Sequence, residues 1–395
     1  LMVYAADFAR LLQDAREYGW QIGESQFDWQ QFRQVRDREI QRLRDSQAHA
    51  LLEAGIEVIR GQACFTDVRT LTVDDRQLTA EKFLLAVGGK PIKPPIPGIE
   101  YSLTSDEIFA ISQLPTHLAI LGAGYIGIEF ASIFRRLGTE VTVLDRAPGI
   151  LTGFDPDLSN LVHEGLNQRG IQIRCNTTAE AIEPTEQGFQ LQLSGETSQP
   201  ITADVILCAV GRTPNLRELN LEQIGVEIKE NAIAVDAHYR TSQPHIFAIG
   251  DCTDRIQLTP VAREEGRLFA AAEFGDRIRS LDYDRVPSAV FARPEAAAIG
   301  MTEPAAREKF GDRVSCQRIA FQPLYSQLLS QCPETVLLKL VVQQDSGQIL
   351  GVHIVGEHAA EIIQGIALAI KQGATQQTFA QMVGIHPSSA EEFFN

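Results

Sequence analysis

The stretch His117-Leu-Ala-Ile-Leu-Gly-Ala-Gly-Tyr-Ile-Gly-Ile-Glu129, followed by Val141-Thr-Val-Leu-Asp-Arg146, decides the fold of this chain. It begins with an apolar run, residues 117–121, suited to a buried parallel strand. Three glycines follow at the G-x-G-x-x-G spacing where a helix opens, and a second apolar strand ends on an acid. Together these features predict a dinucleotide-binding βαβ unit, although the glycine spacing alone also fits other glycine-rich turns.

Each glycine has a separate physical role in such a unit. Gly122 allows the tight turn, Gly124 lets the backbone approach a pyrophosphate, and Gly127 lets helix and strand pack closely. Asp145 occupies the place of the acid that binds a ribose 2′-hydroxyl in NAD enzymes. The adjacent Arg146 has the charge to bind a 2′-phosphate, so these residues leave both NADH and NADPH open.

The composition is that of a globular protein long enough for two or three domains, with 395 residues, of which 44% are hydrophobic and 22% charged. The formal net charge of −16 argues against nucleic acid and anionic membranes as partners, because both need a basic surface. No run approaches the roughly eighteen apolar residues of a membrane helix, and no signal peptide is visible. We therefore expect a cytoplasmic protein.

The cysteines and histidines show no metal-site spacing. The six cysteines are scattered without a C-x-x-C pattern, which is typical of reduced, cytosolic thiols. His353 and His358 have no cysteine or carboxylate arranged with them, so we predict no metal. Anionic small molecules remain as ligands, and Arg146, Arg212 and Arg267 are candidates to bind them.

The order of helical and strand-like periods divides the chain at about residues 115, 242 and 281. Predicted helices have apolar residues at helical spacing and lie at residues 1–20, 28–55 and 359–372. Predicted strands are apolar or alternating runs between turn residues and lie at 56–59, 63–65, 71–73, 83–87, 204–210, 246–249, 286–291, 296–299, 337–342 and 349–355. The last segment, 282–395, is an α+β module.

Two of these strands end in similar turns, at Gly88-Gly-Lys-Pro91 and at Gly211-Arg-Thr-Pro214. The likeness suggests two nucleotide-binding domains of related build, of which only the later shows its glycine triplet. The strand at 246–249 ends on Gly250 and Asp251. An aspartate at the C-terminal end of a parallel strand can contact a cofactor's ribityl or phosphate groups, and a simple turn aspartate is the alternative.

The tail His386-Pro-Ser-Ser-Ala-Glu391 carries the residues of a proton shuttle. Pro387 suits the first turn of a short helix, which would hold His386 extended just outside it. A carboxylate behind a histidine fixes the tautomer and stabilises the imidazolium, a role that Glu391 can fill. The alternative is an exposed histidine before a helix whose first-turn acids are favoured by the helix dipole.

Glu129 and Tyr125 lie on the helix that follows the glycine turn. A carboxylate at the position of Glu129 is costly unless a cation pairs with it, so it needs a partner. The ring of Tyr125 could cover the nicotinamide site, although simple packing is the alternative for a tyrosine there.

In these motifs the whole chain resembles a class I pyridine nucleotide-disulfide oxidoreductase, most like the glutathione reductases of that family. The motifs occur in the family's order and are highly specific in combination. They are Gly122-Ala-Gly-Tyr-Ile-Gly-Ile-Glu129, Ala209-Val-Gly-Arg-Thr-Pro-Asn215, Ile249-Gly-Asp251, Leu258-Thr-Pro-Val-Ala262 and His386-Pro-Ser-Ser-Ala-Glu391.

The resemblance implies an α/β fold with two Rossmann-like nucleotide-binding domains and a C-terminal α+β dimerisation domain. Residues 1–115 and 243–281 would bind FAD, 116–242 would bind NAD(P)H, and 282–395 would complete the partner's active site in a homodimer. The cofactor-binding residues would be Gly122, Gly124, Gly127, Asp145, Arg146, Gly211, Asp251 and Thr259.

The resemblance also implies catalytic roles. Tyr125 would gate the nicotinamide pocket, and Glu129 would pair with a family lysine that precedes Leu1. His386 would be the acid/base that serves the opposite subunit's dithiol, with Glu391 orienting it. Arg267 matches an arginine that binds a glutathione carboxylate, and a surface salt bridge is its alternative.

The chain departs from the family pattern at three places. The FAD glycine triplet and the C-x-x-x-x-C redox pair would both lie upstream of Leu1, so we expect this sequence to be an N-terminally truncated part of an intact enzyme. Asp145 favours NADH on physical grounds, whereas family membership favours NADPH, and Thr152 stands where a second arginine is usual. Gln47 replaces a tyrosine that many glutathione reductases carry at the substrate site.

The predicted function is therefore the reduction of glutathione disulfide by NAD(P)H through FAD and a cysteine pair. A first alternative is a related member of the family that acts on dihydrolipoamide or another small disulfide with NAD(H). A second alternative, from a different class, is a nucleotide-binding fragment without catalysis, because the dithiol is not among these residues.

Overall fold

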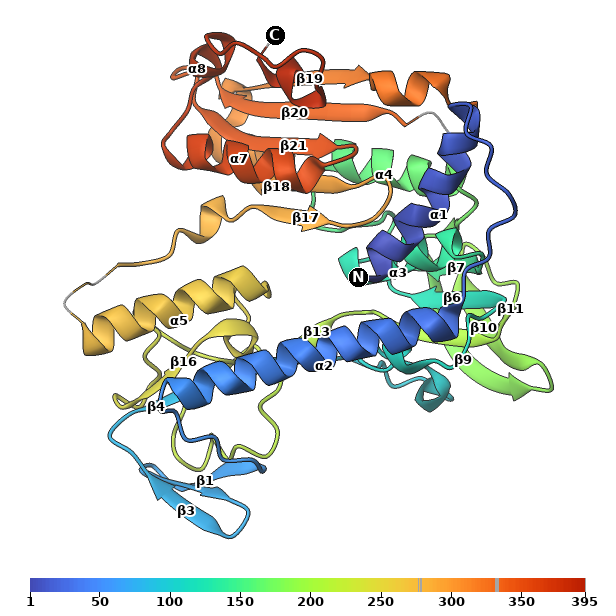
Figure 1. Ribbon diagram of the computed structural model, residues 1–395. Coiled ribbons are helices and arrows are strands. Elements are labelled where there is room, and N and C mark those ends of the chain that lie inside the picture. Colours follow the sequence, from blue (N-terminus) through green and yellow to red (C-terminus); the bar gives the residue numbers. More distant parts are fainter. Residues whose placement is uncertain (276, 278, 331–333, 395) are drawn as a thin grey trace. The chain divides into compact units, whose positions relative to one another are not determined.

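The computed structural model describes residues 1–395 except 276, 278, 331–333 and 395 (Figure 1). The described residues form two compact units. Unit 1 comprises Leu1–Gln30, Lys93–Val210 and Asp284–Asn395, and unit 2 comprises Gln31–Ile92 and Gly211–Tyr283. These units group residues by packing, and the predicted domain limits at residues 115, 242 and 281 stay a prediction.

A four-stranded parallel sheet of order β12-β6-β7-β8 forms one part of unit 1. Its strands are β6 (His117–Leu121), β7 (Glu140–Leu144), β8 (Gln172–Arg174) and β12 (Val205–Cys208). Helix α3 (Tyr125–Arg136) joins β6 to β7, and α4 (Pro156–Gln168) joins β7 to β8. The predicted βαβ unit is confirmed, since β6 and β7 pair in parallel over their whole length.

The remaining elements around this parallel sheet are antiparallel strands and one helix. A three-stranded antiparallel sheet is made of β9 (Thr177–Thr185), β10 (Gly188–Gly195) and β11 (Ile201–Ala203). Helix α1 (Met2–Glu17) packs against α3, where Asp7 lies 2.6 Å from a guanidinium nitrogen of Arg136. The buried side chains of the two sheets form a common apolar core.

A five-stranded antiparallel sheet of order β17-β18-β21-β20-β19 forms the C-terminal part of unit 1 (Figure 1). Its elements are β17 (Ser288–Val290), β18 (Ala296–Gly300), α6 (Glu303–Phe310), β19 (Val314–Phe321), β20 (Val336–Gln343), β21 (Ile349–Val355), α7 (Ala359–Lys371) and α8 (Gln376–Ala380). Alternate residues such as Leu338 and Leu340 pack with Ile363 and Ile366 of α7. The α+β pattern predicted for this segment is confirmed.

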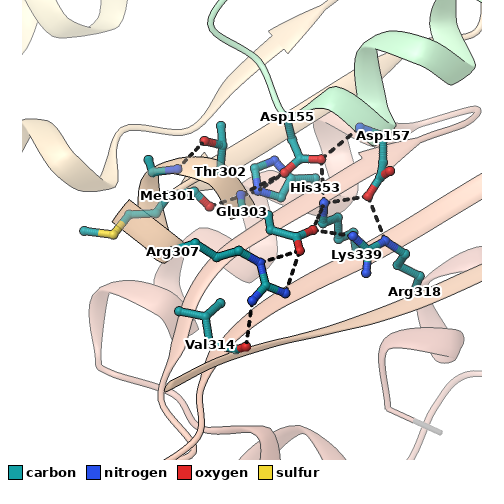
Figure 2. A network of polar contacts seen from close by, with 11 residues as sticks. Asp155, Asp157, Met301, Thr302, Glu303, Arg307, Val314, Arg318, Lys339 and His353 are labelled. Carbon is teal, nitrogen blue, oxygen red and sulfur yellow. Dashed lines mark hydrogen bonds and ion pairs between the residues drawn. The ribbon is translucent and has the colours of Figure 1, made fainter. Parts of the chain in front are cut away.

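The opposite face of this sheet carries charge. Arg318, Lys339 and His353 are direct neighbours across β19, β20 and β21. Figure 2 shows that this row faces Asp155 and Asp157 at the start of α4. The charged row therefore joins the C-terminal sheet to the second crossover helix of the parallel sheet.

Unit 2 is built from shorter pieces. Its elements are most of α2 (Trp29–Glu53), β1 (Ala63–Asp67), β2 (Thr70–Val73), β3 (Arg76–Thr79), β4 (Phe83–Leu85), β5 (Gly89–Pro91), β13 (Arg212–Pro214), β14 (Ile228–Lys229), β15 (Ala232–Ile233), β16 (Ile246–Ala248) and α5 (Thr259–Phe274). β4 and β16 pair in parallel, and β5 and β13 pair in antiparallel. The two strand ends that looked alike in sequence thus meet in one ladder.

Two local expectations were wrong, and several strands were not expected. Residues 56–59 form no strand, because their apolar side chains follow the end of α2 without a pairing partner among the described residues. The unexpected strands include β3 and β19, in which polar residues interrupt the apolar pattern, and β9 to β11. Pro387 precedes the N-cap Ser388 of a short 3-10 helix, Ser389–Phe393, and so lies outside its first turn.

Glu303 is kept ionised by cationic side chains around it, among them Lys339 of the charged row and Arg307 of its own helix (Figure 2). Burial opposes ionisation, but hydrogen bonds from Lys339 and Arg307 outweigh it and lower the pKa of Glu303 from 4.5 to about 2. Because the folded pKa lies below the unfolded one, this contribution to stability is complete above pH 4.5. It is lost as the pH falls toward 2.

Replacement of this carboxylate by Glu303→Gln should lower Tm at neutral pH. The difference in Tm from wild type should shrink as the pH falls from 4.5 toward 2, because wild-type Glu303 is then protonated too. Thermal unfolding of the full-length protein over a pH series measures this. Glu308→Gln, at an exposed position of the same helix, is the control. A Tm difference independent of pH would contradict the assignment.

Candidate functional site

The glycine turn between β6 and α3 has the geometry of an anion site. Gly122 has φ +104°, and a Cβ on it would lie 2.4 Å from the carbonyl oxygen of Ala209. A Cβ on Gly127 would lie 2.0 Å from the carbonyl oxygen of Gly122, so helix and turn touch. A Cβ on Gly124 would meet nothing within 4 Å. Gly124 is also the N-cap and gives α3 no side-chain cap, so first-turn N–H groups can receive a pyrophosphate.

Asp145, at the end of β7, is engaged with the backbone of this turn. Its Oδ2 accepts a hydrogen bond from the Ala123 N–H at 2.5 Å, and its Oδ1 accepts one from the Ala147 N–H at 2.8 Å. Arg146 beside it is exposed. Each oxygen of the acid thus has a backbone donor, while the neighbouring guanidinium extends at the surface.

Glu129 and Tyr125 lie one helical turn apart on α3. The Glu129 carboxylate accepts a hydrogen bond from the Phe291 N–H at 2.9 Å. Burial raises the pKa of Glu129, and this hydrogen bond only partly offsets the effect. The side chain of Tyr125 is 39% exposed. No lysine among the described residues contacts Glu129, so the pairing implied by the resemblance stays a prediction.

Asp251, a predicted flavin residue of unit 2, lies beside one end of the β5–β13 ladder. Gly250 has φ +72°, and it leads into Asp251 directly after β16. A Cβ on Gly89 would lie 3.4 Å from the Cβ of Asp251, so the end of β5 approaches the same point. Arg212 donates a hydrogen bond to the Gly89 carbonyl at 2.7 Å. These contacts bring the segments 88–91 and 211–214 close to Asp251. The second segment begins with Gly211, which has φ +145°.

Thr259, the other residue predicted to contact the flavin cofactor, is the first residue of α5. The N-cap Leu258 offers no side-chain cap to this helix. The Asp251 carboxylate forms no hydrogen bond or ion pair with any residue that the structure describes. A helix N-terminus without a cap and a carboxylate without a partner fit the phosphate and hydroxyl groups of a dinucleotide.

Glu265 was missed in the sequence. Its side chain is 1% exposed, and its Oε2 accepts a hydrogen bond from the Gly250 N–H at 2.6 Å. Its Oε1 accepts one from the Tyr283 hydroxyl at 2.5 Å, and Arg255 donates to that hydroxyl at 2.9 Å. The available signal was its helical spacing, since Val261, Glu265 and Leu268 share the buried face of α5.

His386 and Glu391 are in contact as the tail motif predicts. The Nδ1 of His386 lies 3.1 and 3.2 Å from the two carboxylate oxygens of Glu391. Ser388 and Glu391 form a capping box that fixes the carboxylate. The His386 side chain is 84% exposed, while that of Glu391 is 14% exposed. With Nδ1 held by the carboxylate, Nε2 is directed to solvent and can exchange a proton.

The other predicted residues show no assembled site. Arg267 is exposed and lies 3.3 Å from Glu264, which is the surface salt bridge weighed as its alternative. No disulfide links the cysteines that the structure describes, and Cys332 lies outside the described residues. Among the described residues no cluster of histidine, cysteine, aspartate and glutamate could hold a metal ion. None of the described helices is long and apolar enough to cross a membrane.

Comparison with known proteins gives the same assignment along the whole chain. Glutathione reductases of Nostoc sp. and Burkholderia cepacia are 47% and 38% identical to all of this chain, which covers 88% and 87% of their lengths. The chloroplastic/mitochondrial glutathione reductase of Pisum sativum is 38% identical to all of the chain, which covers 71% of its length.

A solved structure, the HOCl-induced flavoprotein disulfide reductase RclA from Escherichia coli, matches with a TM-score of 0.84 and 28% identity. The match covers 97% of this chain and 87% of that one. Residues 10–266 match the family pyridine nucleotide-disulphide oxidoreductase, and residues 286–395 match its dimerisation domain. These matches confirm the predicted α/β fold with a C-terminal dimerisation domain. The chain belongs to the pyridine nucleotide-disulphide oxidoreductase family.

Proposed function

We propose that this protein reduces glutathione disulfide with electrons from NADPH, using FAD. The observation that carries the proposal is the identity to glutathione reductases, 47% in the Nostoc relative, along the entire chain. The glycine turn of α3 and the strand end at Asp251 fit two dinucleotides by their backbone donors and close approaches. FAD, when bound, supplies the electron transfer between the nicotinamide and the dithiol predicted upstream of Leu1.

His386 is the acid/base of this reaction. Glu391 holds the Nδ1 of the imidazole, which leaves Nε2 to donate a proton to the leaving thiolate of glutathione. Nε2 first takes this proton from a thiol of the dithiol, and the same carboxylate stabilises the imidazolium until the proton is passed to the leaving thiolate, which restores the neutral imidazole. Because His386 is exposed and belongs to the segment that matches a dimerisation domain, it serves the partner's site in a homodimer.

NADPH is the preferred nucleotide, with Arg146 binding the 2′-phosphate. The identity to glutathione reductases supports this choice, and Arg146 supplies the positive charge that a 2′-phosphate needs. Asp145 stabilises the turn by accepting the N–H groups of Ala123 and Ala147. The location we propose is the cytoplasm, because its reducing environment keeps thiols reduced and the cysteines of this chain are scattered without a disulfide pattern.

The substrate is tested by steady-state assay of the full-length protein with NADPH and either glutathione disulfide or lipoamide. We expect turnover of glutathione disulfide and a loss of kcat of about a hundredfold or more in His386→Gln, because the proton donor is removed. His238→Gln, at an exposed position, is the control. Preference for lipoamide, or no turnover of glutathione disulfide, would contradict the proposal.

Nucleotide preference is tested by Arg146→Leu. Loss of a charge-assisted contact to the 2′-phosphate should raise KM for NADPH by about tenfold or more and leave KM for NADH nearly unchanged. Arg313→Leu, whose exposed side chain contacts Asp345 and the Phe310 carbonyl, is the matched surface control. An unchanged KM for NADPH would show that another group binds the 2′-phosphate.

Flavin retention is tested by Glu265→Leu. Without its carboxylate the Gly250 N–H loses its acceptor, so the turn that carries Asp251 is loosened and FAD should dissociate several-fold faster. Release is followed by flavin fluorescence. The adjacent Glu264→Leu, on the exposed side of α5, is the control, and Tyr283→Phe removes only one support of Glu265. Equal release rates in Glu265→Leu and Glu264→Leu would refute the assigned role.

A further inference from the structure

Lys339 is an unusual residue for the centre of a β-sheet. Its side chain is 1% exposed in β20. The ammonium lies 2.7 Å from Asp155, 2.5 Å from Asp157 and 2.8 Å from Glu303 (Figure 2). A buried ion group of this kind gives little net stability compared with an apolar side chain of similar size, so it calls for a role in fixing a particular arrangement.

Asp155 is the member of the cluster with the most constrained position. It is fully buried, and its Oδ1 accepts hydrogen bonds from Lys339 and from the Asp157 N–H as the N-cap of α4. Its Oδ2 accepts one from the Glu303 N–H at 2.9 Å, and the Nε2 of His353 lies 4.0 Å away. The C-terminal sheet thus fixes the residue at which α4 begins.

Asp155 also ends the loop that starts at Asp145, and this loop holds the glycine turn. The Leu151 N–H donates to the Ala123 carbonyl at 2.9 Å, and the Phe154 N–H donates to the Leu151 carbonyl at 3.0 Å. At the other end of the loop, Asp145 accepts from the Ala123 N–H. One loop therefore grips both sides of the peptide backbone at Ala123, between Gly122 and Gly124.

We propose that Lys339 is a positioning residue for nucleotide binding, which acts through Asp155 on the loop of residues 146–154 and on the glycine turn. The inference rests on the proposed function only in that this turn binds NADPH. A shift of Asp155 would move its neighbour Phe154, which is hydrogen-bonded to the Leu151 carbonyl. Leu151 in turn donates to the Ala123 carbonyl, so the glycine turn would move as well. Arg146 lies in the same loop, so the position of a 2′-phosphate contact depends on the same anchor.

The test is the dissociation constant of NADPH in Lys339→Met and Asp155→Asn, measured by fluorescence titration of the full-length flavoprotein. We expect Kd to rise about three- to thirtyfold, the span of such indirect effects, with kcat at saturating NADPH nearly unchanged. Hydrogen exchange at residues 147–154 should accelerate. Lys371→Met, an exposed lysine of the same sheet-and-helix region, is the control and should match wild type.

Two features keep the test decisive. Lys339→Met leaves three carboxylates facing one another and can fail to fold, in which case Asp155→Asn decides, because asparagine preserves the N-cap. A lower Tm with unchanged Kd and unchanged loop exchange would reduce Lys339 to a structural role and overturn the proposal. Because the titration needs no disulfide substrate, a wild type that binds NADPH without reducing glutathione disulfide would refute the proposed substrate alone.

Discussion

An ammonium group buried in a sheet stays charged only if carboxylates surround it, and this constraint organises unit 1. Lys339 meets that need with acids from two distant parts of the chain, since Asp155 precedes it by 184 residues and Glu303 lies on α6. The arrangement fixes where α4 begins relative to the C-terminal sheet. Because α4 follows the loop that grips Ala123, the geometry of the nucleotide turn is tied to a sheet that contributes no residue to the turn itself.

The features predicted from sequence are those with short-range signals. The spacing of Gly122, Gly124 and Gly127 predicts their roles, because the turn, the helix cap and the close approach all occur within six residues. The contact of His386 with Glu391 is local for the same reason. The charged row of Arg318, Lys339 and His353 had no such signal, since its residues come from three strands and meet only when the sheet pairs.

Asp145 shows how a structure changes the meaning of a residue that the sequence had singled out. Its position at the end of β7 indicated a ribose ligand, and that inference assumed that its oxygens point to the nucleotide. The two oxygens accept N–H groups of Ala123 in the glycine turn and of Ala147 in the loop, which gives Asp145 a structural role beside the nucleotide contact that stays a prediction. Glu265 is the converse case, because a carboxylate on an apolar helix face can be recognised in sequence, but its partner Gly250 cannot.

The most direct test of this account is a crystal structure of the full-length protein with bound NADP⁺. The account predicts the pyrophosphate at the N-terminus of α3 beside Gly124, the 2′-phosphate on Arg146, and Asp145 still bonded to the Ala123 N–H. A ribose 2′ position in contact with Asp145, with the bond to Ala123 broken and Arg146 turned away, would contradict it.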